Sequence, residues 1–254
     1  MSIKKDTIIF TQRDLKIFKF LSYYGYADLE ALYMLTKNFY PCSMEVFLKR
    51  IYRLRKTGWL EINNYSMPSS TREVSRFKFF IISGNVKTFM HLKMRPPEIK
   101  LFKSNFFHEF FIIRTLAKCM ENGEAVFSER MDEYSFSQDD IRPDVYMPDK
   151  KIGFEIETSV KRNWTEYAYK FAVLQRQLDA AKWAKKEPDI KKLIYLVESS
   201  DEKMALIKKI ENTKSQSIDL GKDGKEYIVD STINEHIRVF VFDNFFKQDI
   251  SSFH

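Results

Sequence analysis

Apolar residues in the first part of the chain recur at the spacing of an α-helix in three successive segments. The first, TQRDLKIFKFLSYYG, offers Thr11 as an N-cap and Gly25 just past its end. The second, DLEALYMLTK, begins with Asp28 as a possible cap, and the third runs through YPCSMEVFLKRIYRLRKTGWL. The chain is therefore predicted to begin with three amphipathic helices. The inward positions of the third helix are predicted to be Val46, Phe47, Ile51 and Leu54.

The segment after these helices alternates between apolar and polar residues. WLEINNYSMPSSTREVSRFKFFII predicts a β-hairpin with a flexible tip from Ser66 to Arg72. Three short helices followed by a hairpin resemble a winged helix-turn-helix, in which the third helix enters the major groove and the hairpin follows the DNA backbone. The resemblance implies that duplex DNA is bound by basic residues of the third helix and the hairpin: Lys49, Arg50, Arg53, Lys56, Arg72, Arg76 and Lys78.

The charge of the chain is concentrated in the same part. Of 42 Lys and Arg and 35 Asp and Glu, residues 1–100 contain 18 and 8, and the remaining residues contain 24 and 27. A basic part joined to a slightly acidic part is typical of a nucleic-acid-binding domain beside a domain with another role. Two alternatives are a basic surface that serves solubility and a basic helix in a domain that binds protein.

A domain boundary is predicted at MRPPEIK. Pro96 and Pro97 cannot lie inside a helix, so the chain is divided into a winged helix-turn-helix domain at 1–95 and a second domain at 96–254. In the second domain, SNFFHEFFIIRTLAKCMENG predicts a helix from about Ser104 to Gly123. A strand, a hairpin, a long helix, a strand, a helix and a last strand, HIRVFVFDNF, follow. This order predicts a mixed α/β domain.

The hairpin of the second domain, IRPDVYMPDKKIGFEIETS, carries three carboxylates. With Asp149 and Lys150 as the turn, Asp144 faces Glu155 across the hairpin, and Glu157 points the same way two residues on. Opposed like charges destabilise a sheet, and a divalent cation between them would offset the repulsion. The pattern predicts that Asp144, Glu155 and Glu157 hold Mg²⁺ or Mn²⁺. The alternative is an exposed hairpin face paired with Lys150, Lys151 and Lys161.

These motifs resemble the PD-(D/E)xK nucleases, which have the restriction-endonuclease-like fold. Pro143-Asp144 matches the PD, Glu155 matches the next acidic residue, and Glu157 stands where the family has lysine. Some branches carry that lysine on the following helix, where Lys170 would match it and Lys161 is the weaker substitute. The resemblance implies metal-dependent phosphodiester cleavage, with Lys170 orienting the water or stabilising the phosphate. Glu109 would match an extra acidic residue on the preceding helix.

A narrower resemblance covers most of the chain. The winged helix, HEFFI, RPDVYM, FEIETS and a helix with Tyr167 and Lys170 are similar to the replication-relaxation family, related to C-class mobilisation relaxases. That family implies nicking or relaxation of DNA at a plasmid or mobile-element origin, initiating transfer or replication, with transfer or replication proteins as possible partners. His108 is either an acid or base or a structural histidine. Among 13 tyrosines, Tyr146, Tyr167 and Tyr169 are candidate nucleophiles.

Other features limit where the protein acts and leave a second function open. The chain has no run of about twenty apolar residues and no CxxC pair, since Cys42 and Cys119 lie far apart. We therefore expect a cytoplasmic protein with free thiols and no membrane span. The alternative function is a non-catalytic DNA-binding regulator, accessory protein or adaptor whose nuclease-like domain has lost its chemistry, which Glu157 favours. The sequence leaves the DNA target, its strand and the oligomeric state open.

Overall fold

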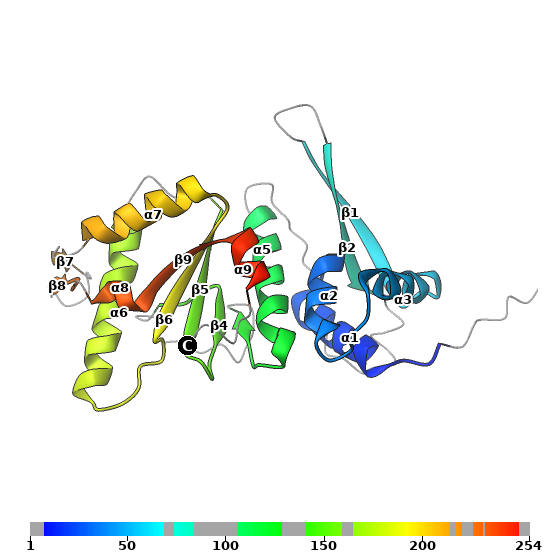
Figure 1. Ribbon diagram of the computed structural model, residues 1–254, viewed down its shortest axis with the longest axis horizontal. Coiled ribbons are helices and arrows are strands. Elements are labelled where there is room, and N and C mark those ends of the chain that lie inside the picture. Colours follow the sequence, from blue (N-terminus) through cyan, green and yellow to red (C-terminus); the bar gives the residue numbers. More distant parts are fainter. Residues whose placement is uncertain are drawn as a thin grey trace, which may run out of the picture. The chain divides into compact units, whose positions relative to one another are not determined.

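The chain is a mixed α/β protein that divides into two compact units, Met1–Gly123 and Glu124–His254 (Figure 1). The computed structural model describes residues 8–68, 74–83, 106–128, 141–158, 165–213, 217–219, 226–230 and 232–248. No helix in these ranges has the length and apolar character needed to cross a membrane. Cys42 and Cys119 are both free thiols.

The first unit begins with three helices and a hairpin, as the sequence predicts. The helices are α1 (Gln12–Tyr24), α2 (Leu29–Lys37) and α3 (Met44–Lys56), and the antiparallel strands are β1 (Leu60–Pro68) and β2 (Val74–Ile82). Thr11 and Asp28 cap α1 and α2 as expected, because their side chains accept hydrogen bonds from the backbone N–H groups of Asp14 and Ala31. Gly25 ends α1 with a φ of 85°.

A buried ion pair joins α1 to α3. Asp14 is 0% exposed, and its carboxylate accepts hydrogen bonds from the Nε and Nη2 groups of Arg50. The second of these nitrogens also donates to the carbonyl of Ile9 at 2.9 Å. Arg50 was predicted to contact DNA, but its guanidinium is instead committed to this pair. The helical pattern of α3 groups Arg50 with other cations. It gives no information about Asp14, which lies 36 positions earlier in the sequence.

A fourth helix, α5 (Phe106–Cys119), followed by the 3₁₀ helix η1 (Met120–Asn122), completes the first unit. Phe106 stacks on Tyr65 of β1 with ring centroids 4.5 Å apart, and it also contacts Phe79 of β2. Arg114 pairs with Asp28, the cap of α2, at 2.5 Å. The predicted boundary at residues 95 and 96 placed this helix in the second domain. The two compact units divide after it, because its aromatic face packs on the hairpin.

The second unit is built around a five-stranded mixed sheet. Its strand order is β3-β4-β5-β6-β9, in which the first two pairings are antiparallel and the last two are parallel. The strands are β3 (Phe127–Ser128), β4 (Val145–Met147), β5 (Ile152–Glu157), β6 (Lys192–Val197) and β9 (Ile237–Val241). The central strands β5 and β6 are almost continuously buried, which is typical of strands covered on both faces.

Helices cover both faces of this sheet. On one face, α6 (Thr165–Trp183), α7 (Ser200–Thr213) and α8 (Ile233–His236) enclose a core that includes Phe171, Leu193 and Tyr195. On the other face, Phe245 of α9 (Phe242–Lys247) packs edge-on against Phe154. The small antiparallel pair of β7 (Ser217–Asp219) and β8 (Glu226–Ile228) lies beside this core (Figure 1).

Three local predictions differ from the structure. The strands of the first hairpin extend to Pro68 and from Val74, so Ser66 belongs to a strand and not to the tip. Val46 on α3 is 51% exposed, although its spacing suggested an inward position. The segment HIRVFVFDNF is a strand only from Ile237 to Val241, and α9 begins at Phe242.

The Asp14–Arg50 pair generates a stability prediction. Arg50→Ala leaves a fully buried carboxylate without its partner, and we expect it to lower the free energy of unfolding by about 3–5 kcal/mol. Arg53→Ala, an exposed position one turn along α3, is the matched control and should change it by less than about 0.5 kcal/mol. Urea unfolding measures both. Equal stabilities of the two variants would contradict a structural role for Arg50.

Candidate active site

The carboxylates of the second hairpin face one another as predicted. Val145 pairs with Phe154 and Met147 with Ile152, and the same register sets Asp144, just before β4, opposite Glu155 on β5. The turn spans residues 148–151, where the Lys151 N–H donates to the carbonyl of Pro148 at 3.1 Å. The predicted turn and its register are therefore confirmed.

Asp144 is fixed by its own backbone surroundings. The N–H of Ile156 donates to Asp144 Oδ2 at 2.7 Å, which ties the carboxylate to β5. The preceding residue, Pro143, packs on Gly153, where an added Cβ would lie 2.9 Å from the proline ring. A side chain at Gly153 would therefore push Pro143 and Asp144 away from β5. This close approach accounts for a proline and a glycine at these positions.

Glu155 is buried, although the alternation of apolar and polar residues along its strand suggested an exposed side chain. It is 3% exposed because α6 covers its face of the sheet, and Lys170 of α6 donates to its Oε2 atom at 2.5 Å. The other oxygen, Oε1, is also buried and has no hydrogen-bond partner. The alternative of an exposed face paired with nearby lysines is wrong for Glu155. Lys150 and Lys151 pair instead with Glu124 and Glu187, at 2.8 and 3.1 Å.

Burial and neighbouring charge perturb both members of this ion pair. The pKa of Glu155 is raised to about 7, chiefly by burial and also by the charges of Asp144 and Glu157, whereas Lys170 opposes the shift. Burial by itself would lower the pKa of Lys170, but attraction to Glu155, Glu157 and Asp144 outweighs it, so the pKa is raised. Lys170 therefore carries a positive charge beside three acidic groups, and Glu155 titrates near neutrality.

Tyr195 is a member of this site that the sequence analysis missed. It lies on β6 directly beside Glu155, is fully buried, and has a hydroxyl with no hydrogen-bond partner. Burial and the nearby carboxylates raise the pKa of Tyr195 well above its ordinary value. The phenol therefore stays protonated and can donate a hydrogen bond. Its segment, KKLIYLVES, gave no signal because a tyrosine in an apolar strand is typical of a core.

The carboxylates of this site fit a divalent cation with two carboxylate ligands better than a cation with three. Among the described residues, no three or more His, Cys, Asp or Glu side chains are gathered to hold a metal ion. The predicted three-carboxylate site is thus not preformed. The unpaired Oε1 of Glu155 lies in the field of Asp144, however, and Mg²⁺ often takes one or two carboxylates and completes its shell with water and phosphate. Asp144 and Glu155 would be those ligands.

The other residues predicted for this site lie at the end of β5, on α5 in the first unit, or outside the described residues. Glu157 ends β5 and is partly exposed, and Lys161 lies outside the described residues. His108 and Glu109 lie on α5 in the first unit, so the geometry of the second unit does not test their roles. Their assignment stays a prediction.

The three candidate tyrosine nucleophiles differ in their exposure and contacts. Tyr146 donates its hydroxyl to the carbonyl of Asp189 at 2.6 Å, and Tyr167 is 2% exposed. Tyr169 is 43% exposed on α6. Of these three, Tyr169 is the most exposed, and Tyr146 is partly exposed.

The predicted DNA-binding residues of the first unit divide into distinct groups. Arg53 and Lys56 are exposed on α3, and Lys49 forms only an exposed pair with Glu45, of a kind that stabilises little. Tyr52, 40% exposed, shares this face. On the hairpin, Lys78 is exposed, and the backbone of Arg76 pairs with that of Ser66. Arg72 lies outside the described residues.

The raised pKa of Glu155 predicts a pH dependence of stability. Its folded pKa, about 7, exceeds the ordinary 4.5, so the wild type is fully stabilised below about 4.5 and loses stability as the pH rises through 7. Glu155→Gln removes this titration. Relative to the wild type, the variant should gain on the order of 3 kcal/mol in unfolding free energy between pH 4.5 and pH 8.5. Denaturant unfolding across this range measures the difference, and parallel pH profiles would contradict the burial of an ionisable Glu155.

Comparison of the chain with protein-family models, curated proteins and solved structures finds no match in any of the three. The resemblances to PD-(D/E)xK nucleases and to the replication-relaxation family therefore rest on the motifs of the sequence. Function is inferred from the geometry of the chain's own residues.

Proposed function

We propose that the protein binds duplex DNA through its first unit and cleaves a phosphodiester bond with a divalent metal ion in its second unit. The observation that carries the proposal is the buried Glu155–Lys170 pair beside Asp144, with one carboxylate oxygen left without a partner. A structural ion pair normally satisfies its polar atoms. An unsatisfied buried oxygen beside a second carboxylate indicates a missing ligand.

The arrangement supports the assignment of a PD-(D/E)xK nuclease to the second unit. Asp144 and Glu155 lie side by side on an antiparallel pair of strands, and a lysine reaches Glu155 from the next helix. This is where branches with a displaced lysine would have it. The match supports Lys170, and not Glu157, as the functional counterpart of the family's lysine.

The residues of the site have separable tasks in this proposal. Asp144, held by the Ile156 N–H, and Glu155 would bind Mg²⁺ or Mn²⁺, which when bound would acidify a water and neutralise charge on the phosphate. Lys170 would supply positive charge to the phosphate as negative charge develops there. Tyr195, protonated and without a partner, would donate a hydrogen bond within the same site. Burial under α6 strengthens each of these interactions.

The first unit supports the DNA-binding half of the proposal. Its three helices and hairpin have the order of a winged helix-turn-helix, and α3 presents Lys49, Arg53 and Lys56 together with Tyr52. Binding would release counterions from the phosphates and so weaken with salt. Nicking or relaxation at a plasmid or mobile-element origin is the narrower form of this proposal.

A second candidate function is a non-catalytic DNA-binding regulator or accessory protein. Two observations favour it: the described residues hold no preformed group of three metal ligands, and Glu157 occupies the usual lysine position. In that case the Glu155–Lys170 pair would be a remnant with no metal affinity. Divalent-ion uptake distinguishes the two functions.

Lys170 provides the sharpest test of catalysis. On supercoiled plasmid in Mg²⁺, we expect Lys170→Met to reduce nicking by roughly a hundredfold, the scale seen when one group that stabilises transition-state charge is removed. The assay is run at pH 8.5, because Lys170 also lowers the pKa of Glu155 and its removal would otherwise protonate that ligand. Lys208→Met, at an exposed position of α7, is the matched control. Lys161→Met should have a much smaller effect. Wild-type nicking by Lys170→Met would remove this lysine from the mechanism.

The exposed basic residues of α3 generate a prediction about DNA binding. Arg53→Ala with Lys56→Ala should weaken duplex binding and reduce the slope of log affinity against log salt by about one for each phosphate that the variant no longer neutralises. Fluorescence anisotropy across a salt series measures the slope, and divalent-ion uptake should not change. The matched control is Lys208→Ala with Lys247→Ala, two exposed lysines of the second unit. Equal slopes for the wild type and the α3 variant would place DNA binding elsewhere.

A further inference from the structure

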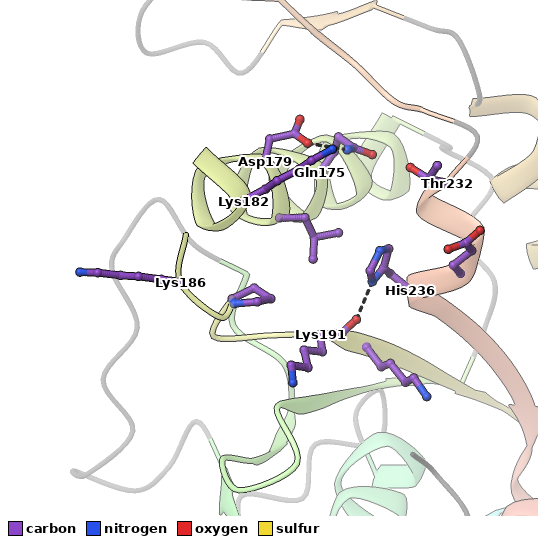
Figure 2. A pocket seen from close by; sticks show the side chains of 11 residues that line it. Gln175, Asp179, Lys182, Lys186, Lys191, Thr232 and His236 are labelled. Carbon is purple, nitrogen blue, oxygen red and sulfur yellow. Dashed lines mark hydrogen bonds between the residues drawn. The ribbon is translucent and has the colours of Figure 1, made fainter. Parts of the chain in front are cut away.

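A cavity lies in the second unit at the amino-terminal ends of two parallel strands. It measures about 630 Å³ and is lined by the end of α6, the segment before β6, and α8 (Figure 2). Lys192, at the start of β6, lines it, whereas Tyr195, beside Glu155, lies three residues farther along the strand, or roughly 10 Å. The cavity is therefore distinct from the carboxylate site.

The cavity has an apolar lining and one oriented imidazole. Leu178 of α6 and Pro188 contribute apolar surface. His236 of α8 contacts the carbonyl of Lys191 through Nδ1 at 2.8 Å, and since a carbonyl only accepts, Nδ1 carries the proton. Figure 2 shows Gln175, Asp179 and Lys182 on α6 and His236 across from them. Such surfaces suit a flat ring packed between aliphatic groups and an imidazole.

Gln175 adds an unsatisfied acceptor. Its side chain is buried at 6% exposure and lines the cavity, and its Nε2 atom donates to Asp179 at 3.1 Å. Its Oε1 atom is buried and has no hydrogen-bond partner. A buried acceptor without a donor costs free energy unless a ligand or water supplies one. Gln175 therefore places a buried acceptor without a donor in the wall of the cavity.

The rim of the cavity is basic. Four lysines line it against two carboxylates, Asp179 and Glu235. Lys191 shares an ion pair with Glu187 at 2.8 Å, whereas Lys182 and Lys186 have no ion-pair partner within the part of the chain that the structure describes. In Figure 2 Lys186 points away from the other labelled side chains, into solvent. The rim therefore presents exposed ammonium groups of a kind that suits a phosphate.

We propose that this cavity binds a nucleotide. Its base would pack against Leu178, Pro188 and His236, an amino or ring N–H would donate to Gln175 Oε1, and its phosphate would lie at the lysine rim. The volume falls within the range of small-molecule sites. A free mononucleotide and one nucleotide of a single strand share this chemistry. The proposal does not depend on the carboxylate site.

The test is a titration of the full-length chain in low salt, followed by the imidazole NMR signals of His236. The probes are dAMP, a short single-stranded oligonucleotide, deoxyadenosine and inorganic phosphate. We expect saturable binding of dAMP, of the oligonucleotide, or of both, with shifts of the His236 signals, and at least tenfold weaker binding of deoxyadenosine and of phosphate. Saturation by dAMP identifies a free nucleotide as the ligand, and saturation by the oligonucleotide alone identifies a strand.

Two variants separate the rim from the general charge of the protein. Lys182→Glu should weaken binding of the saturating probe about tenfold, whereas Lys208→Glu, an equal charge change outside the cavity, should leave it within about twofold. Gln175→Leu keeps the volume and removes the acceptor, and it should weaken binding of the adenine base while leaving phosphate binding unchanged. Equal effects of the two lysine variants would overturn the proposal. So would equal affinities for phosphate and the nucleotide probes, or no saturation by either nucleotide probe.

Discussion

The contact between Glu155 and Lys170 is the interaction on which the second unit's proposed chemistry depends. Helix α6 buries the carboxylate on a covered face of the sheet, and the same helix supplies the ammonium that compensates its charge. Burial alone would favour a neutral glutamic acid, and Lys170 alone would favour a carboxylate. The balance leaves a group that changes charge near neutral pH. Such a balance is more typical of functional sites than of structural ion pairs.

A second buried ion pair in the same chain shows the contrast. Asp14 uses both carboxylate oxygens: Oδ1 accepts from the Nε of Arg50, and Oδ2 accepts from Arg50 Nη2 and from the backbone N–H and hydroxyl of Thr11, the α1 cap. That pair is satisfied and joins two helices. Glu155 uses only one oxygen and leaves the other without a donor. The satisfied pair therefore has a structural explanation that the unsatisfied one lacks. This difference separates Arg50, which forms a structural ion pair, from Lys170, which is a candidate for catalysis.

Local patterns in the sequence predicted those parts of the fold that depend on nearby residues. The caps of α1 and α2 and the register of Asp144 against Glu155 follow from spacing over a few positions. The burial of Glu155 could not be predicted in this way, because alternation treats a polar strand residue as exposed, and the helix that covers it lies farther along the chain. The assignment of α5 to the first unit depends on aromatic contacts with Tyr65 and Phe79, about 30 to 40 residues earlier.

Two further features could not be predicted from the sequence, because they too depend on contacts between residues that are distant in the chain. Tyr195 belongs to the site only because parallel pairing sets β6 beside β5. The nucleotide-sized cavity is formed by α6, α8 and the segment between α6 and β6, none of which carries a recognisable motif. Contacts between distant segments thus determine which polar groups are buried without a hydrogen-bond partner. Lys170 was nevertheless correctly predicted to lie at the edge of the apolar stripe of α6, beside the sheet, where it contacts Glu155.

The most direct test of the central claim is Mn²⁺ binding, measured by the decrease of the free-ion electron paramagnetic resonance signal at pH 8. We predict that the wild-type chain takes up Mn²⁺ saturably, and that Asp144→Asn and Glu155→Gln each abolish this uptake without unfolding the protein. Glu187→Gln, which alters an exposed carboxylate elsewhere in the same unit, should bind as the wild type does. Absence of Mn²⁺ uptake by the wild type, or uptake unaffected by the Asp144 and Glu155 substitutions, would contradict a metal site at this carboxylate pair.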